Sequence, residues 1–322
     1  MIGGNWRIIG YAQNFGVTAW FPTGNGISKH LNFIKLSLDY IKQTGIKVVR
    51  VGLLEDGRTV FNKAGRVTGY DEIFRRDVRD FLDLVNEANI KVEFTLFDYL
   101  IAGKPGEVSR VWLRGRSNVI TDEEVKDNFI SQFLTPFLNE FEYHPALIGF
   151  DVINEPEWVI SREDGGGWDD YHDLATKAEE PVSGEAMKIF ITDCIETIRE
   201  YAPTKLITVG TCAKFIPLVM DLDIDYFALH HYPWMYKLRA YLRLQPIGKP
   251  WSLEEFPTRA TPISIPGYLN LTLEAGGTGA MLWNLTPQID KFTFSCSQRD
   301  AKLQELRNWV DMHAQDIYCS DS

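Results

Sequence analysis

The sequence predicts an α/β fold, a single (β/α)8 barrel of the TIM type with extended βα loops. Short apolar runs alternate with amphipathic helical patterns along all 322 residues. There are eight such runs, the number of parallel strands that closes a barrel with helices outside. An open doubly wound sheet is the alternative, but no GxGxxG or P-loop glycines follow the first run. The alternation therefore favours the closed barrel.

The eight expected strands are short and largely apolar, as parallel strands buried on both faces are. They span residues 15–20, 47–51, 91–97, 147–153, 206–210, 226–231, 251–255 and 279–283. No linker, internal repeat or low-complexity segment interrupts them. Residues 1–322 are therefore expected to form one catalytic barrel domain.

Helices are expected where apolar residues recur three and four positions apart, because this spacing makes one buried stripe. These segments lie at about 29–45, 74–85, 128–141, 187–198 and 303–310. Cys194 falls on such a stripe and is expected in the core. Three loops that follow strands are long, at 53–70, 98–121 and 155–183, whereas the turns before strands are short. Active sites of such barrels lie where the long loops gather.

Composition narrows the partners and the compartment. The net charge of −11 argues against nucleic acid or an anionic membrane as a partner. No apolar run approaches the roughly 20 residues of a membrane helix, and no leader is visible at the start. The chain is therefore expected to be soluble, either in the cytoplasm or secreted with its leader removed. Its four cysteines lack CxxC spacing and nearby histidines, so neither metal nor cofactor is expected. Pairing of Cys296 with Cys319 stays open.

Tryptophans occur in polar, glycine-rich segments where nothing indicates burial in a core. Exposed rings of this kind suit the flat apolar faces of sugars, although a core position is the alternative for each. These residues are Trp20, Trp112, Trp158, Trp168 and Trp234.

Two apolar runs end in carboxylates. The run 147–153 is followed by Asn154-Glu155-Pro156, and the run 251–255 ends in Glu254-Glu255 before Phe256. A carboxylate is costly to bury, so at a barrel strand end it is expected to face the cleft and a reacting group. Retaining glycoside hydrolysis uses two carboxyls about 5–5.5 Å apart. Taken singly, each glutamate has the alternative of a surface or helix-capping acid.

These motifs, together with Val48-Val49-Arg50, His230-His231-Tyr232 and Trp283 at other strand ends, resemble those of the clan A glycoside hydrolases. The resemblance is greatest to glycoside hydrolase family 5, with its cellulases and mannanases, and it covers nearly the whole barrel. It implies that Glu155 is the acid/base and Glu255 the nucleophile.

The resemblance also implies substrate-binding residues. Asn154 would hold the 2-hydroxyl of the sugar, and Arg50 would orient the nucleophile and keep it ionised. Tyr232 would hydrogen-bond the nucleophile, His230 would lie near the acid/base, and Trp283 would form the floor of the subsite. Core positions are the alternatives for Trp283 and for one of the two histidines.

The chain departs from the family pattern at two strand ends. Glu254 stands where the family often has glycine, and strand alternation allows only one of the adjacent glutamates to face the barrel axis; Phe256 favours Glu255. Asp98 stands where many family 5 cellulases have histidine, which weakens a cellulase assignment. Asp98, Trp158 and Trp20 complete the expected substrate-binding set. The segment 53–58 either lines a subsite or forms a loop salt bridge.

The predicted function is a retaining glycoside hydrolase that cleaves β-linked mannan, glucan or xylan, with carbohydrate as its partner and no metal or cofactor. A metal-dependent barrel hydrolase is disfavoured, because the six histidines include no HxH. A catalytically silent carbohydrate-binding barrel is the remaining alternative.

Overall fold

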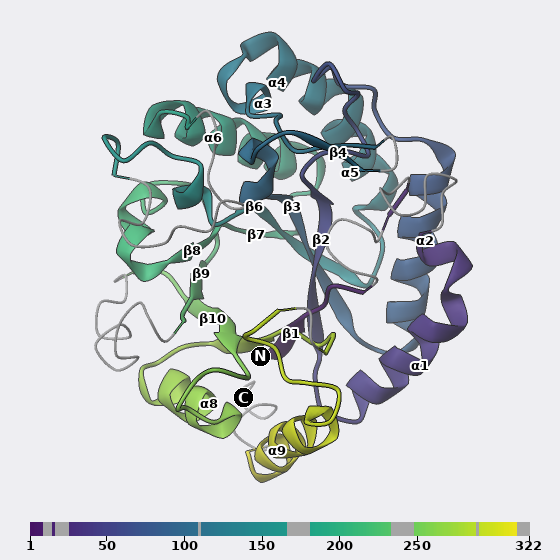
Figure 1. Cartoon of the computed structure of the whole chain (residues 1–322), viewed down its shortest axis with the longest axis vertical. Coiled ribbons are helices and arrows are strands. Elements are labelled where there is room, and N and C mark those ends of the chain that lie inside the picture. Colours follow the sequence, from purple (N-terminus) through teal and green to yellow (C-terminus); the bar gives the residue numbers. More distant parts are fainter. Residues whose placement is uncertain are drawn as a thin grey trace.

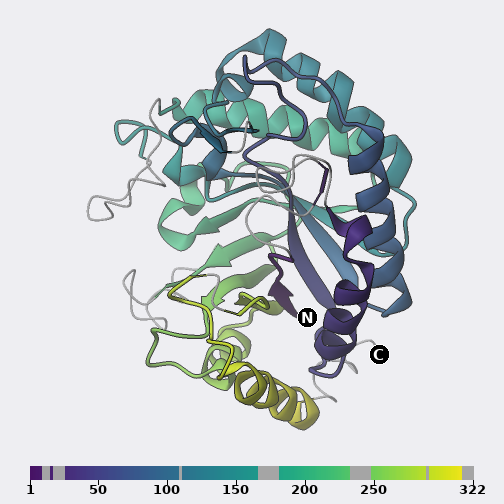
Figure 2. The same cartoon turned by 45° about the vertical axis from the view of Figure 1, so that its right-hand side comes forward.

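The strands close into a barrel (Figures 1 and 2). The computed structural model describes residues 1–8, 15–16, 26–108, 111–165, 181–232, 248–287 and 290–313. Within them, nine parallel strand segments pair in the order β7-β6-β3-β2-β1-β11-β10-β9-β8. The two ends of this order, β7 and β8, are separated along the chain only by Val209, so they are parts of one interrupted strand. The predicted barrel is therefore confirmed.

The barrel segments are three to eight residues long, and most are buried along their whole length. They are β1 Ile2–Asn5, β2 Val48–Glu55, β3 Lys91–Asp98, β6 Leu147–Asn154, β7 Leu206–Thr208, β8 Gly210–Cys212, β9 Phe227–His230, β10 Trp251–Pro257 and β11 Gly279–Trp283. A separate antiparallel pair, β4 Gly106–Val108 and β5 Val111–Leu113, lies in the long connection after β3.

Helices form a ring outside the strands (Figure 1). They are α1 Leu31–Lys42, α2 Glu72–Glu87, α3 Asn118–Thr121, α4 Glu123–Phe129, α5 Thr135–Phe141, α6 Gly184–Tyr201, α8 Ile265–Glu274 and α9 Arg299–Met312. Short 3-10 turns span Ile27–Lys29, Tyr99–Ala102, Pro156–Trp158 and Ala213–Leu218. The five predicted helical segments are confirmed, and Cys194 of α6 is fully buried as expected. No helix in the described part of the chain is long and apolar enough to cross a membrane.

The predicted first strand is wrong. Phe15 and Gly16 form a bend, and residues 17–20, including Trp20, lie outside the described residues. The place between β2 and β11 belongs instead to β1, which pairs with both. Phe15 packs on the aromatic rings of Phe74 and Phe81 from α2, so its apolar character serves the layer outside the barrel.

Two glycines explain why β1 escaped prediction. Glycine is depleted in strands, so the segment Ile-Gly-Gly-Asn lacks a strand pattern. A Cβ on Gly3 would lie 2.8 Å from the backbone oxygen of Val48, and one on Gly4 would lie 2.8 Å from Leu285. The Val48 backbone and the Leu285 side chain thus leave no room for a side chain at Gly3 and Gly4. Polar residues at the end of β1, Asn5 and Arg7, consequently escaped notice as site residues.

A ladder of phenylalanines holds the α4–α5 segment against the sheet. Phe129, Phe133, Phe137 and Phe141 recur every four residues, and neighbouring ring centroids lie 5.5, 5.5 and 4.9 Å apart. In an ideal α-helix a spacing of four drifts about 40° per step around the axis. A π-helical turn at Ile130–Leu134 lies inside the ladder, and its wider turn keeps the rings on one face.

We expect Phe133→Ala to lower the free energy of unfolding by about 3–5 kcal/mol, because removal of a fully buried ring leaves a cavity. Denaturant unfolding followed by fluorescence measures the loss. Phe33→Ala, on α1 with the side chain 55% exposed, is the control and is expected to change stability by less than about 0.5 kcal/mol. Equal losses in the two variants would contradict the ladder's role.

Candidate active site

Glu155 lies directly after β6, at the end of the barrel from which the long loops leave. Its backbone is left-handed, with φ 51° and ψ 56°, a conformation uncommon for residues other than glycine, and Pro156 follows it. Its Oε1 lies 3.0 Å from Nδ1 of His230, and its Oε2 accepts a hydrogen bond of 3.0 Å from Nε1 of Trp158. Both carboxyl oxygens are thus oriented, and the side chain stays slightly exposed.

Glu255 lies on β10 and receives two hydrogen bonds. Arg50 donates to its Oε1 at 2.9 Å, and the hydroxyl of Tyr232 donates to its Oε2 at 2.8 Å. Burial raises the pKa of Glu255, but His230, Arg50 and Tyr232 outweigh burial, and the pKa lies below its ordinary value. Glu255 is therefore an ionised carboxylate at neutral pH.

His230 stands between the two glutamates. Its Nδ1 is 3.0 Å from Glu155 and 3.7 Å from Glu255, and one oxygen of each glutamate lies within 4.8 Å of the other. Burial lowers the pKa of His230, but the two carboxylates raise it above its ordinary value. The neighbouring His231 faces the other way, with its ring 5.9 Å from that of Tyr268 in α8.

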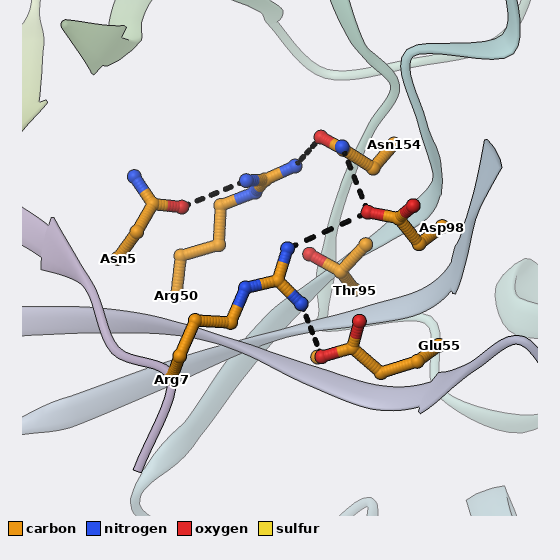
Figure 3. Close-up of a pocket in the computed structure, with 8 residues that line it drawn as sticks. Asn5, Arg7, Arg50, Glu55, Thr95, Asp98 and Asn154 are labelled. Carbon is orange, nitrogen blue, oxygen red and sulfur yellow. Dashed lines mark hydrogen bonds and ion pairs between the residues drawn. The ribbon is translucent and has the colours of Figure 1, made fainter. Parts of the chain in front are cut away.

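Arg50 connects Glu255 to residues of the barrel interior, and its bonds to Asn5 and Asn154 are drawn in Figure 3. Besides Glu255, its guanidinium donates to Asn5 Oδ1 at 2.7 Å and Asn154 Oδ1 at 2.6 Å, and it pairs with Asp151. Burial lowers the pKa of Arg50, but the surrounding carboxylates raise it well above its ordinary value. Arg50 is thus a permanent cation, buried at 3% exposure.

A small pocket opens beside Arg50 and Asn154 (Figure 3). The Nδ2 of Asn154 donates to Asp98 at 3.1 Å, and Arg7 reaches Asp98 at 3.4 Å while pairing with Glu55. Burial raises the pKa of Asp98 to about 7, against the opposing charge of Arg7. The lining residues are Asn5, Arg7, Arg50, Gly52, Glu55, Thr95, Asp98 and Asn154.

Trp283, the last residue of β11, lies beside Arg7 and Tyr232. Its Nε1 donates to Asp290 at 2.6 Å, and the Arg7 guanidinium lies 5.2 Å from its ring centre. It belongs to a small buried cluster with Tyr232, Cys212 and Phe215. The aromatic side chain therefore lies beside the residue that contacts Glu255.

Both glutamates of β10 face the barrel interior, so the expectation that strand alternation admits only one is wrong. Glu254 Oε2 and Glu255 Oε1 lie 3.9 and 2.9 Å from nitrogens of the same Arg50 guanidinium. The reason is an irregularity in β10. Leu253 pairs with Leu229, and the next partner of β9, His230, pairs with Glu255, so Glu254 is an extra residue.

Comparison with known proteins identifies the family. The family model for cellulases of glycosyl hydrolase family 5 matches residues 15–248. The chain belongs to glycoside hydrolase family 5. The resemblance read from the strand-end motifs is thereby confirmed.

Two curated family 5 relatives are named mannan endo-1,4-beta-mannosidase. That of Mytilus edulis is 27% identical over an alignment of 246 residues, which covers 71% of this chain and 59% of the mussel protein. That of Cryptopygus antarcticus is 25% identical over an alignment of 220 residues, which covers 65% of this chain and 52% of that protein. The match thus spans little more than half of each relative. The solved structure of the β-1,4-mannanase of Aplysia kurodai, 20% identical, covers 97% of this chain and 92% of its own with a TM-score of 0.73, which bears on the fold alone.

The structure of this family 5 chain brings together most residues expected at the site. Within hydrogen-bonding or packing distance of one another are Arg50, Asp98, Asn154, Glu155, Trp158, His230, Tyr232, Glu255 and Trp283. Trp20, Trp168 and Trp234 lie outside the described residues, as does Cys319. Trp112 of β5 lies elsewhere, with Lys63 4.7 Å from its ring centre.

The loop salt bridge expected in the segment 53–58 is confirmed, and the alternative of a subsite stays a prediction. Glu55 lines the pocket and pairs with Arg7, whereas Asp56 and Arg58 form a loop salt bridge at 2.8 Å. Sequence reasoning missed Arg7 because β1 was placed too far along the chain. It also missed two acids inside barrel strands, Glu93 and Asp151, whose signal was a charge within an otherwise apolar run.

Two clusters in the described part of the chain have a spacing that a metal ion could use: Glu155 with Glu157 and Cys212, and Glu155 with His230 and Glu255. Glu157 accepts hydrogen bonds from Cys212 N and from a threonine hydroxyl, and the oxygens of Glu255 are engaged as described above. Bonds within the protein account for both clusters, and we assign neither a metal. The expectation of a metal-free site stays a prediction.

We expect Arg50→Met to destabilise the protein by about 3–5 kcal/mol, because it leaves several buried carboxylates without their cation. The loss should be larger at about pH 7 than at about pH 3. Glu255, whose pKa Arg50 helps to lower, contributes stability above the unfolded-state pKa, and this stability is lost as pH falls. Denaturant unfolding at both pH values measures the loss.

Arg79→Met is the control for this prediction. Arg79 pairs with Glu140 at 2.5 Å on the surface, with its side chain 54% exposed. An exposed pair contributes about 0–1 kcal/mol, so this variant should unfold much like the wild type. A loss for Arg50→Met that is small and independent of pH would contradict the assigned role of Arg50.

Proposed function

We propose that the protein is an endo-acting retaining β-1,4-mannanase, with Glu255 as nucleophile and Glu155 as acid/base. One observation carries the proposal: the two glutamates approach to within 4.8 Å between oxygens while lying in opposite surroundings. Retaining glycosidases hold their two carboxyls about 5–5.5 Å apart, whereas inverting ones leave room for a water at about 6.5–9.5 Å. The short separation favours retention.

The surroundings of Glu255 suit a nucleophile. The two hydrogen bonds from Arg50 and Tyr232 stabilise its negative charge, and they orient both oxygens. In the first step a Glu255 oxygen attacks the anomeric carbon, and the bond from that carbon to the leaving oxygen breaks. The leaving oxygen takes its proton from Glu155, and a covalent glycosyl-enzyme results.

The surroundings of Glu155 suit the proton transfers. In the second step water attacks the anomeric carbon, Glu155 takes the proton of that water, and Glu255 departs as a carboxylate. Trp158 can only donate through its indole nitrogen, so it holds Oε2 as an acceptor in both steps. His230 lies against Oε1 and keeps the carboxyl aimed at the reacting centre.

The substrate class is supported by the names of the relatives and by the pocket beside Asn154. Asn154 has a second amide hydrogen besides the one donated to Asp98, and we propose that it binds the 2-hydroxyl of the sugar. Mannose and glucose differ in the direction of this hydroxyl. Asp98 and Arg7 line the adjacent space, where they would meet it, and Trp283 offers an apolar ring for the sugar face.

We expect Glu155→Ala to lower kcat/KM on β-1,4-mannan by about 10²–10⁴-fold, and to lower kcat/KM much less on a dinitrophenyl β-mannobioside, whose leaving group needs no proton in the first step. Glu255→Ala should lose activity on both. Added azide should restore turnover of the aryl glycoside to Glu255→Ala and give a glycosyl azide of inverted configuration. Initial rates and nuclear magnetic resonance of the product measure these effects.

Glu157→Gln is the matched control, an acid two residues from Glu155 that is fully buried and bound to Thr211 and Cys212. It should keep activity on both substrates within about tenfold of the wild type, since Glu157 does not touch the reacting atoms. Near wild-type rates for Glu255→Ala would overturn the assignment of the nucleophile.

We expect kcat/KM for β-1,4-mannan to exceed that for carboxymethyl cellulose and xylan by at least about tenfold, because a site built to bind one hydroxyl direction rejects the other. Endo cleavage should lower the viscosity of galactomannan well before reducing ends accumulate. Release of mannose or mannobiose without an early fall in viscosity would contradict endo action, and a preference for cellulose would contradict the substrate.

A further inference from the structure

The residue before the proposed nucleophile has a side chain that the reaction does not use. Glu254 is fully buried, with 0% exposure, at the irregularity of β10. The extra residue turns its carboxyl into the barrel, beneath Glu255 and towards the interior acids. A carboxyl in such a position is costly in its charged form unless donors surround it.

Donors are scarce around Glu254. Neither of its carboxyl oxygens, nor Oε1 of Glu93, has a hydrogen-bond partner among the described residues. Arg50 Nε is 3.7 Å from Glu93 and 3.9 Å from Glu254, while the other nitrogens of Arg50 bind elsewhere. Glu93 has one donor, the hydroxyl of Tyr226, which bonds its Oε2. Glu254 is therefore the less satisfied of the two acids.

A proton on Glu254 supplies the missing hydrogen-bond donor. A protonated carboxyl has an O–H donor, and Oε1 of Glu93 is a buried acceptor without a donor. Among the described residues, the titratable and charged groups that face Glu254 are Arg50 from β2, Glu93 from β3, Asp151 from β6 and Tyr226 from before β9. A single cation thus faces several acids, which favours the neutral form of one of them.

We propose that Glu254 is a positioning residue that stays a neutral carboxylic acid, donates a hydrogen bond to Glu93 and so leaves Arg50 to Glu255. Burial raises the pKa of Glu254 well above its ordinary value, and the charge of Glu93 adds to this effect against Arg50. Burial also raises the pKa of Glu93, which Arg50 and Tyr226 oppose. The pKa of the adjacent Glu255 is instead lowered. One of two neighbouring glutamates on β10 is therefore neutral and the other is negatively charged.

Ionisation of Glu254 would add a further anion within 3.9 Å of Arg50, besides Asp151, Glu93 and Glu255, and draw the guanidinium from Glu255. The neutral state of Glu254 therefore preserves the 2.9 Å bond between Arg50 and the nucleophile. This consequence rests on the proposed function, because it assigns the nucleophile to Glu255. The protonation of Glu254 itself does not rest on the proposed function, because it also affects the stability of the folded chain.

The test compares two isosteric amide variants, Glu254→Gln and Glu93→Gln, in the full chain. The amide of Glu254→Gln can still donate to Glu93, so this variant should fold and keep kcat/KM on dinitrophenyl β-mannobioside within about threefold of the wild type near pH 6. Glu93→Gln replaces one of the two acceptor oxygens by an NH2 donor, so either Glu254 or Tyr226 loses its acceptor. This variant should unfold at lower denaturant concentration and lose activity by more than about tenfold.

The pH dependence of unfolding gives a readout independent of activity. The folded wild type holds a proton on Glu254 that the unfolded chain releases above about pH 4.5, so its stability falls as pH rises. Glu254→Gln lacks this proton. Relative to the wild type, the unfolding constant of the variant should therefore fall by up to about tenfold per pH unit between about pH 5 and 8.

Three results would overturn the inference: a Glu254→Gln variant that fails to fold, stability profiles of variant and wild type that run parallel with pH, or a folded variant whose kcat/KM drops more than about thirtyfold near pH 6. The first two would show that Glu254 is not a neutral acid, and the third that its neutral form does not serve Glu255. Absence of mannan hydrolysis by the wild type would count against the proposed function alone, because the unfolding profiles would still report the proton.

Discussion

The buried guanidinium of Arg50 is the constraint on which the rest of the site depends. It bonds Asn5 from β1, Asp151 and Asn154 from β6, and Glu255 from β10. A cation inside a barrel needs such partners, because its desolvation would otherwise cost several kcal/mol. The partners in turn need the cation. Strands distant in sequence are thereby brought to one register at the active end of the barrel.

The irregularity of β10 brings two adjacent glutamates to Arg50. Regular alternation would turn one of two adjacent glutamates outward. The extra residue instead lets both approach the Arg50 guanidinium, Glu254 near Nε and Glu255 near a terminal nitrogen. Glu255 has two close donors, whereas Glu254 has none among the described residues. Identical side chains thus acquire opposite protonation from their surroundings, which is how one fold keeps an acid and a carboxylate close together.

Much of the architecture could be predicted because its signals are local. Apolar runs and helical stripes located every barrel strand but β1, and the strand-end motifs located Glu155 and Glu255. The misses have physical causes. Backbone of Val48 lies too close to Gly3 for a side chain, and the Leu285 side chain fills the space beside Gly4; no strand propensity reports such contacts. The placement of Asn5 and Arg7 at the pocket followed from that strand and was lost with it.

The sequence by itself determined the fold class, the family and the two glutamates at strand ends, since each depends on periodicity or on a short contiguous motif. The tertiary structure alone decided how Arg50 is shared, where Arg7, Glu55 and Asp98 meet, and that both glutamates of β10 face inward. These features depend on the register between strands and on distances of a few ångströms between residues as far apart as 205 positions. Charge states follow from such distances and from burial, which a single sequence does not report.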